Sequence, residues 1–121
     1  MAKKRKKKKI GLSPEFYERH EWIQRNIARR LAESGGGYEI VHRSPGLELG
    51  VYVLVAPAGD SQQPHADDEI YVGLEGRGTL EVDGEILPIS EGTALFVPAG
   101  AEHHFTGYES LSVLVIFTRP D

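Results

Sequence analysis

Three side chains that could share one metal ion lie in two distant parts of the sequence. The run His65-Ala-Asp-Asp-Glu69 supplies one imidazole and one carboxylate, and His103 supplies a second imidazole. Neutral imidazole and carboxylate are ordinary ligands of divalent first-row metals. Two histidines and one carboxylate with open coordination positions form the ligand set of non-haem Fe(II) oxygenases. The residue types therefore predict a metal site.

These side chains must be positioned by short strands. In an extended segment alternate side chains share a face, so His65 and Glu69 are predicted on one side, with Tyr71 following on that side. His103 and His104 are adjacent in a predicted strand and must point in opposite directions. We expect His103 to be the one that faces inward.

The rest of the chain predicts one all-β domain behind one helix. Residues 13–34 begin with Ser-Pro-Glu, a typical helix start, and carry an apolar stripe at helical spacing. Residues 38–121 contain eight short predicted strands separated by glycine and proline, which favours a sandwich or a barrel. Asp83-Gly84 predicts a two-residue hairpin turn. Residues 75–78, Glu-Gly-Arg-Gly, are predicted to form a tight turn between two strands.

The amino-acid composition of the chain limits the classes of protein to which it could belong. The chain has 121 residues and no cysteine, so disulfides and thiolate zinc sites are excluded. No apolar run is long enough to span a bilayer, and we expect a cytoplasmic protein, or a nuclear one if the source is eukaryotic. Residues 3–9 hold seven of the fourteen basic groups. We interpret residues 1–12 as a solvated, disordered tail. Nucleic-acid binding by this tail is the less favoured alternative, because the rest of the chain has more acidic than basic residues and would repel nucleic acid.

The spacing of residues around His103 resembles a motif of the cupin superfamily. The second cupin motif is G-x5-P-x-G-x2-H-x3-N, and this chain has Gly92, Pro98, Gly100 and His103 in those places, with Gly107 where the family has Asn. The resemblance covers roughly residues 38–118. It implies a double-stranded β-helix, that is, a jelly-roll barrel, with a metal bound inside.

The first cupin motif, G-x5-H-x-H-x3,4-E-x6-G, is matched in its second half. Glu69 is followed at the family's spacing by Gly76, and His65 takes the place of the second histidine, which leaves Gln63 in the place of the first. The resemblance thus implies a metal site of Gln63, His65, Glu69 and His103, and Asp67 remains a rival ligand. Fe(II) is favoured, and Mn, Ni or Zn would also suit these ligands.

The resemblance also implies a function. Similar cupins act on small organic molecules as dioxygenases or isomerases, and Tyr71 is a candidate proton donor beside the metal. The alternative is a non-catalytic cupin that binds a small molecule or serves as a scaffold. A homodimer is expected, because small open barrels leave strand edges that need cover.

Overall fold

The computed structural model describes the backbone of residues 14–118 and the side chains of residues 23–118. The predicted basic tail, and with it the option of nucleic-acid binding, lies outside the described residues. The elements are α1 (Pro14–Glu33), β1 (Gly36–Ser44), β2 (Leu47–Val55), β3 (Asp68–Val82), β4 (Glu85–Ser90), β5 (Ala94–Val97), β6 (His103–Thr106) and β7 (Ser110–Thr118). The predicted class, all-β with one N-terminal helix, is confirmed. Within residues 14–118, no helix combines the length and the apolar content needed to cross a membrane.

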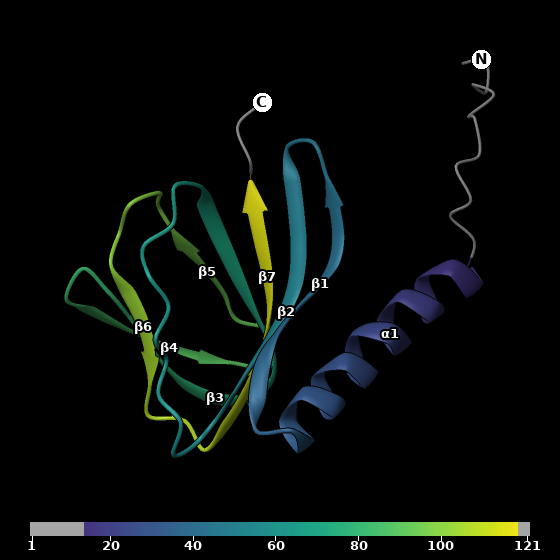
Figure 1. Cartoon of the computed structure of the whole chain (residues 1–121), viewed down its shortest axis with the longest axis horizontal. Coiled ribbons are helices and arrows are strands. Elements are labelled where there is room, and N and C mark those ends of the chain that lie inside the picture. Colours follow the sequence, from purple (N-terminus) through teal and green to yellow (C-terminus); the bar gives the residue numbers. More distant parts are fainter. Residues whose placement is uncertain (1–13, 119–121) are drawn as a thin grey trace, which may run out of the picture.

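The strands form an antiparallel barrel in which β3 belongs to both sheets (Figure 1). The first half of β3 pairs with β7 and β5, and β7 continues through β2 to β1 at the edge. The second half of β3 pairs with β4 and β6. The long strand β3 therefore joins the two sheets, and Glu69 lies near its start.

The predicted turn at residues 75–78 is wrong. The chain continues as one strand through this segment, and its register against β7 shifts between Gly73 and Glu75. Gly76 has a φ of +80°, which a residue without a Cβ adopts without steric cost. The glycine therefore bends the strand from one sheet into the other instead of ending it. By contrast, the hairpin turn at Asp83-Gly84 is confirmed, since both residues have positive φ between β3 and β4.

Helix α1 covers one part of the barrel's outer surface. Its buried side chains Ile27, Ala28 and Leu31 pack against Val51 and Val53 of β2. These valines alternate along β2 with residues that face the interior, so one strand serves both the core and the helix. From Ile23 to Leu31, within the part of the helix whose side chains are described, the predicted apolar stripe thus docks on the outside of the barrel.

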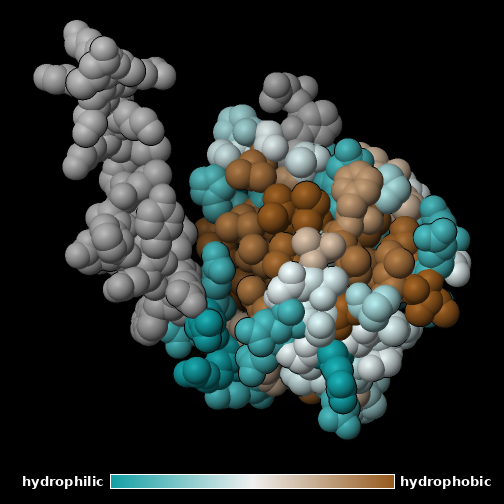
Figure 2. All heavy atoms as spheres, turned by 180° about the vertical axis from the view of Figure 1, so that it is seen from behind, coloured by the Kyte–Doolittle hydropathy of each residue, from teal (hydrophilic) through white to brown (hydrophobic). Residues whose placement is uncertain are grey.

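A second part of this outer surface is apolar and partly exposed. One apolar row crosses four neighbouring strands. Leu49 of β2 pairs with Ile116 of β7, which pairs with Ile70 of β3, and Ile70 pairs with Phe96 of β5. Phe96 is 56% exposed. Seen from behind, the molecule shows a broad hydrophobic area (Figure 2). An apolar area of this kind on a soluble domain is typical of an interface.

We propose that a second copy of the chain covers this row. A straight apolar row can face its own copy across a two-fold axis that lies in the plane of the interface, which is what an isologous dimer requires. Phe96→Lys is expected to convert a dimer into a monomer of 13.4 kDa in light scattering after size exclusion, because the charge would be buried in the interface. The matched control is Ile86→Lys on β4, which is 66% exposed outside this row and should leave the dimer intact. A wild-type protein that stays monomeric at high concentration contradicts the proposal.

Candidate metal centre

The three predicted ligands come from a loop and two strands. Glu69 is the second residue of β3, and His103 is the first residue of β6. His65 lies in the irregular segment between β2 and β3. The Gly100 N–H donates a 2.7 Å hydrogen bond to the His65 carbonyl, so the turn that precedes β6 holds the loop in place.

The structure brings these side chains together. One ligand atom from each of His65, Glu69 and His103 lies within 4.8 Å of the other two. Glu69 and His103 are each 2% exposed, while His65 is partly exposed. The nitrogen Nε2 of His103 is 3.1 Å from Oε1 of Glu69. The residues are thus arranged around one common point next to the barrel interior.

Two of these atoms are buried without a hydrogen-bond partner. Despite their short separation, Oε1 of Glu69 and Nε2 of His103 do not form a hydrogen bond with each other, and neither has another partner. Buried polar atoms are nearly always satisfied, because leaving one unsatisfied costs about 1–3 kcal/mol. A cation ligated by both atoms would satisfy them at once, so the donor set fits a metal ion.

The imidazole of His103 is oriented for ligation through Nε2. Its Nδ1 lies 2.9 Å from the carbonyl oxygen of Ala101, so Nδ1 carries the proton and donates. This hydrogen bond leaves the lone pair of Nε2 directed toward Glu69. A backbone carbonyl in this role fixes the tautomer of metal-binding histidines in general.

The surroundings of His103 also affect its proton affinity. Burial disfavours the charged imidazolium and acts to lower the pKa of His103, but the Glu69 carboxylate and the Ala101 carbonyl outweigh burial, and the pKa is raised. Without a metal, the nearby carboxylate therefore favours the form of His103 that carries a proton on Nε2. A metal ion would take the place of that proton.

His65 is held by aromatic contacts. Its ring lies edge-on to the ring of Phe117 of β7, and the two ring centroids are 5.0 Å apart. The centroid of the His103 ring is 5.3 Å from that of His65. Its Nε2 is 3.5 Å from Oε1 of Gln62. These contacts place the imidazole at the boundary between the buried pair and the solvent.

The predicted fourth ligand, Gln63, lies outside this group. Its side chain is exposed, and its amide nitrogen is 3.5 Å from the Ser61 carbonyl. The neighbouring Gln62 faces the site instead. Asp67, the rival ligand, lines the same cavity but does not belong to the clustered ligand atoms. The motif spacing put Gln63 in the place of the first histidine, but residues 59–67 form an irregular loop that turns Gln62 toward the cavity.

A carboxylate that the sequence reasoning missed organises this loop. Asp60 accepts hydrogen bonds from the Tyr52 hydroxyl at 2.7 Å, from the Phe105 N–H at 2.8 Å and from the Gln62 side-chain amide at 2.6 Å. The backbone N–H of Gln62 also donates to Asp60. Because two of these donors belong to β2 and β6, Asp60 attaches the loop to the barrel. Its hydrogen bonds with Gln62 orient the side-chain carbonyl of Gln62 toward the site. An Asp after Gly59 signals a turn in sequence, but nothing in the sequence reveals its partners.

Tyr71, the predicted proton donor, is fully buried beside the site. Its hydroxyl donates a 2.9 Å hydrogen bond to Oε1 of Gln62. Burial raises the pKa of Tyr71, and the neighbouring Glu69 carboxylate raises it further. The phenol thus keeps its proton, and its hydroxyl is a hydrogen-bond donor to Gln62.

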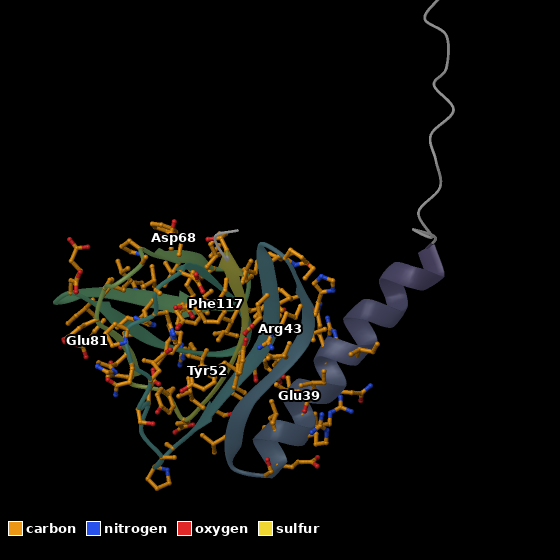
Figure 3. All side chains as sticks on the ribbon, turned by 45° about the horizontal axis from the view of Figure 1, so that its top comes forward. Glu39, Arg43, Tyr52, Asp68, Glu81 and Phe117 are labelled. Carbon is orange, nitrogen blue, oxygen red and sulfur yellow. The ribbon has the colours of Figure 1, made fainter. Side chains whose placement is uncertain are left out.

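A cavity of about 450 Å³ opens next to these residues. Tyr52 and Phe117, labelled in Figure 3 on the neighbouring strands β2 and β7, form part of its wall. The remaining lining residues are Tyr38, Arg43, Glu48, Ser61, Gln62, His65, Asp67, Glu69, Tyr71 and Val115. Concave sites of this size, with apolar walls and a few convergent polar groups, are typical of small-molecule binding.

Comparison with known proteins agrees with this architecture. An uncharacterized protein of Streptomyces coelicolor is 38% identical over 95 residues, which cover 78% of this chain and 90% of that protein. A gentisate 1,2-dioxygenase of a Ralstonia species is 30% identical over 93 residues, which cover 74% of this chain and 26% of that enzyme. An RmlC-like cupin protein of Desulfovibrio desulfuricans, 24% identical, has a TM-score of 0.63 over 74% of this chain and 87% of that one.

The family model of the cupin domain matches residues 51–117. This match runs from the middle of β2 to near the end of β7 and includes His65, Glu69 and His103. It extends over more than half of the chain, and the fold is the antiparallel barrel that the resemblance implied. The protein is a member of the cupin family.

Proposed function

We propose that the protein is a metal-dependent enzyme of the dioxygenase type that acts on a small organic molecule in the cavity beside His65, Glu69 and His103. The observation that carries the proposal is the buried pair of Glu69 and His103. Both ligand atoms lack hydrogen-bond partners and adjoin a cavity large enough for a small substrate. The similarity to a gentisate 1,2-dioxygenase supports the reaction type, although it extends over about a quarter of that enzyme's length.

The roles of the residues follow from their positions. His65, Glu69 and His103 would hold the ion, and Fe(II) is the first choice for two imidazoles and one carboxylate, ahead of Mn, Ni and Zn. When bound, such an ion would polarise an oxygen of the substrate and provide open positions for a second reactant. Gln62 would stand next to His65 with its side-chain carbonyl oxygen facing the site. Tyr71 would keep a proton at its hydroxyl close to the substrate.

A non-catalytic cupin that binds a small molecule is the second candidate. The observation in its favour is that an amide, Gln62, stands beside His65, since an amide carbonyl is a weaker ligand than imidazole. In this case the cavity and its polar groups would serve recognition alone.

Oxygen consumption separates the two functions. Protein purified without chelator would be loaded in turn with Fe(II), Mn(II), Ni(II) or Zn(II) and offered a panel of small aromatic and aliphatic hydroxy acids. The proposal predicts uptake of dioxygen with Fe(II), and products whose mass has increased by that of the oxygen incorporated. Binding of panel members by metal-loaded protein without any turnover would favour the non-catalytic function.

A further inference from the structure

We propose that Arg43 anchors the carboxylate of a small organic acid at the end of the cavity away from the metal ligands. This inference rests on the proposed function, because it places one substrate between Arg43 and the clustered ligands. Among the residues that line the cavity, all within the described part of the chain, Arg43 is the one arginine or lysine. It comes from β1, whereas the metal ligands come from β3, β6 and the loop before β3.

A β-bulge directs Arg43 into the cavity. In the pairing of β1 with β2, Ile40 faces Gly50 and His42 faces Leu49, so Val41 is the extra residue. Val41 packs against the cluster beneath helix α1 on the outer surface. Without this bulge, strict alternation from Ile40 would turn Arg43 outward. Bulges frequently re-aim a side chain next to a functional site.

The guanidinium of Arg43 is held along one edge. Its Nε donates to Oε1 of Glu48 at 3.0 Å, and its Nη2 lies 2.9 Å from the same oxygen. The other oxygen of Glu48 accepts a 2.9 Å hydrogen bond from the Tyr38 hydroxyl. Glu48 is buried, while the side chain of Arg43 is 56% exposed. The planar guanidinium is thus fixed with its opposite edge, which carries further N–H donors, available to a ligand.

The walls of the cavity define the class of ligand. Phe117 pairs in register with both Glu48 and Glu69, so it lies between Arg43's partner and the metal ligands. Tyr52 and Val115 add further aromatic and aliphatic surface to the cavity. A fixed guanidinium edge matches a carboxylate in two parallel hydrogen bonds. The geometry therefore favours a monocarboxylate with a short apolar or aromatic body, whose far end reaches the three ligands.

Benzoate and its neutral analogue benzamide test this assignment, since they differ in charge but hardly in shape. Their dissociation constants would be measured by ligand-observed NMR on metal-free and Zn(II)-loaded protein. Wild type is expected to prefer benzoate by roughly tenfold or more, as hydrogen bonds to a charged group suggest. In the double variant Arg43→Met/Glu48→Gln, which avoids leaving a buried carboxylate unpaired, this preference should disappear while the affinity for benzamide stays unchanged.

Two further variants keep the test decisive. Arg30→Met removes an exposed arginine that pairs with Glu39 outside the cavity, and it should preserve the preference for benzoate. Arg43→Lys keeps the charge without the planar fork, and it should give an intermediate preference even if the double variant does not fold. A preference for benzoate that survives in the folded Arg43 variants would overturn the inference.

The proposed function and the inference about Arg43 would be contradicted by different results. If the protein takes up no Zn(II) but the metal-free form prefers benzoate through Arg43, the proposed function fails and the inference about Arg43 stands. If Zn(II) binds stoichiometrically and the Arg43 variants bind both probes as wild type does, the inference fails and the metal site stands.

Discussion

Replacing His103 by alanine is expected to abolish stoichiometric metal binding. The imidazole Nε2 lies 3.1 Å from Oε1 of Glu69 and is oriented by the Ala101 carbonyl. Loss of groups that merely orient a ligand commonly lowers metal affinity by 10–100-fold, so loss of the ligand itself should lower it by more than about 100-fold. Elemental analysis of protein purified without affinity metals measures the stoichiometry, and a metal titration measures the affinity.

The neighbouring residue provides the control. His104 is exposed and points away from the barrel interior, so His104→Ala should bind metal as wild type does. His103→Ala leaves the Glu69 carboxylate buried without its neighbour, which destabilises the apoprotein. Glu69→Gln keeps the volume and removes the charge, and it should lose the metal while the thermal unfolding transition remains cooperative. Equal metal content in wild type, His103→Ala and Glu69→Gln would contradict the assignment.

Gly73→Ala is expected to lower the free energy of unfolding by about 2–4 kcal/mol. A Cβ at Gly73 would overlap the carbonyl oxygen of Ser90, and that oxygen belongs to the backbone. The backbone of Gly73 cannot shift freely, because its N–H donates to the Thr93 carbonyl and its carbonyl accepts from the Gly92 N–H. The midpoint of thermal unfolding should therefore fall by roughly 10 °C.

Gly59→Ala is the matched control, since a Cβ at that position would meet no heavy atom within 4 Å. Its effect on stability should stay within about 0.5 kcal/mol. Because Gly73 lies two residues beyond Tyr71 on the strand that carries Glu69, metal affinity should fall together with stability in Gly73→Ala alone. A Gly73→Ala protein as stable as Gly59→Ala would mean that β3 and the segment after β4 do not approach as closely as described.

The clustering of His65, Glu69 and His103 could be predicted from sequence because motif spacing reflects a fixed path of the chain. The turn before His103 is short and its glycine and proline positions leave few conformations, so counting residues was enough. In the loop before Glu69 the same counting selected Gln63, whereas the structure turns Gln62 toward the site. The loop's shape depends on the hydrogen bonds of Asp60 with Tyr52 and Phe105, and Phe105 is 45 residues away in sequence.

Two other features depended on contacts that the sequence does not display. A glycine such as Gly76 is expected both where a strand ends and where a strand bends. The pairing of β3 with strands of both sheets shows that the strand bends here. Arg43 faces the cavity because a bulge at Val41 shifts the alternation along β1. A bulge changes which face a residue occupies without any change in composition, so the arginine could not be assigned to the cavity beforehand.

The metal site at His65, Glu69 and His103 is tested most directly by a crystal structure of the protein loaded with Fe(II) or Zn(II), with anomalous diffraction measured at the absorption edge of the metal. We expect one anomalous peak about 2.0–2.2 Å from the imidazole nitrogens of His65 and His103 and from a carboxylate oxygen of Glu69. An empty site at saturating metal, with the carboxylate still beside the His103 ring, would contradict it.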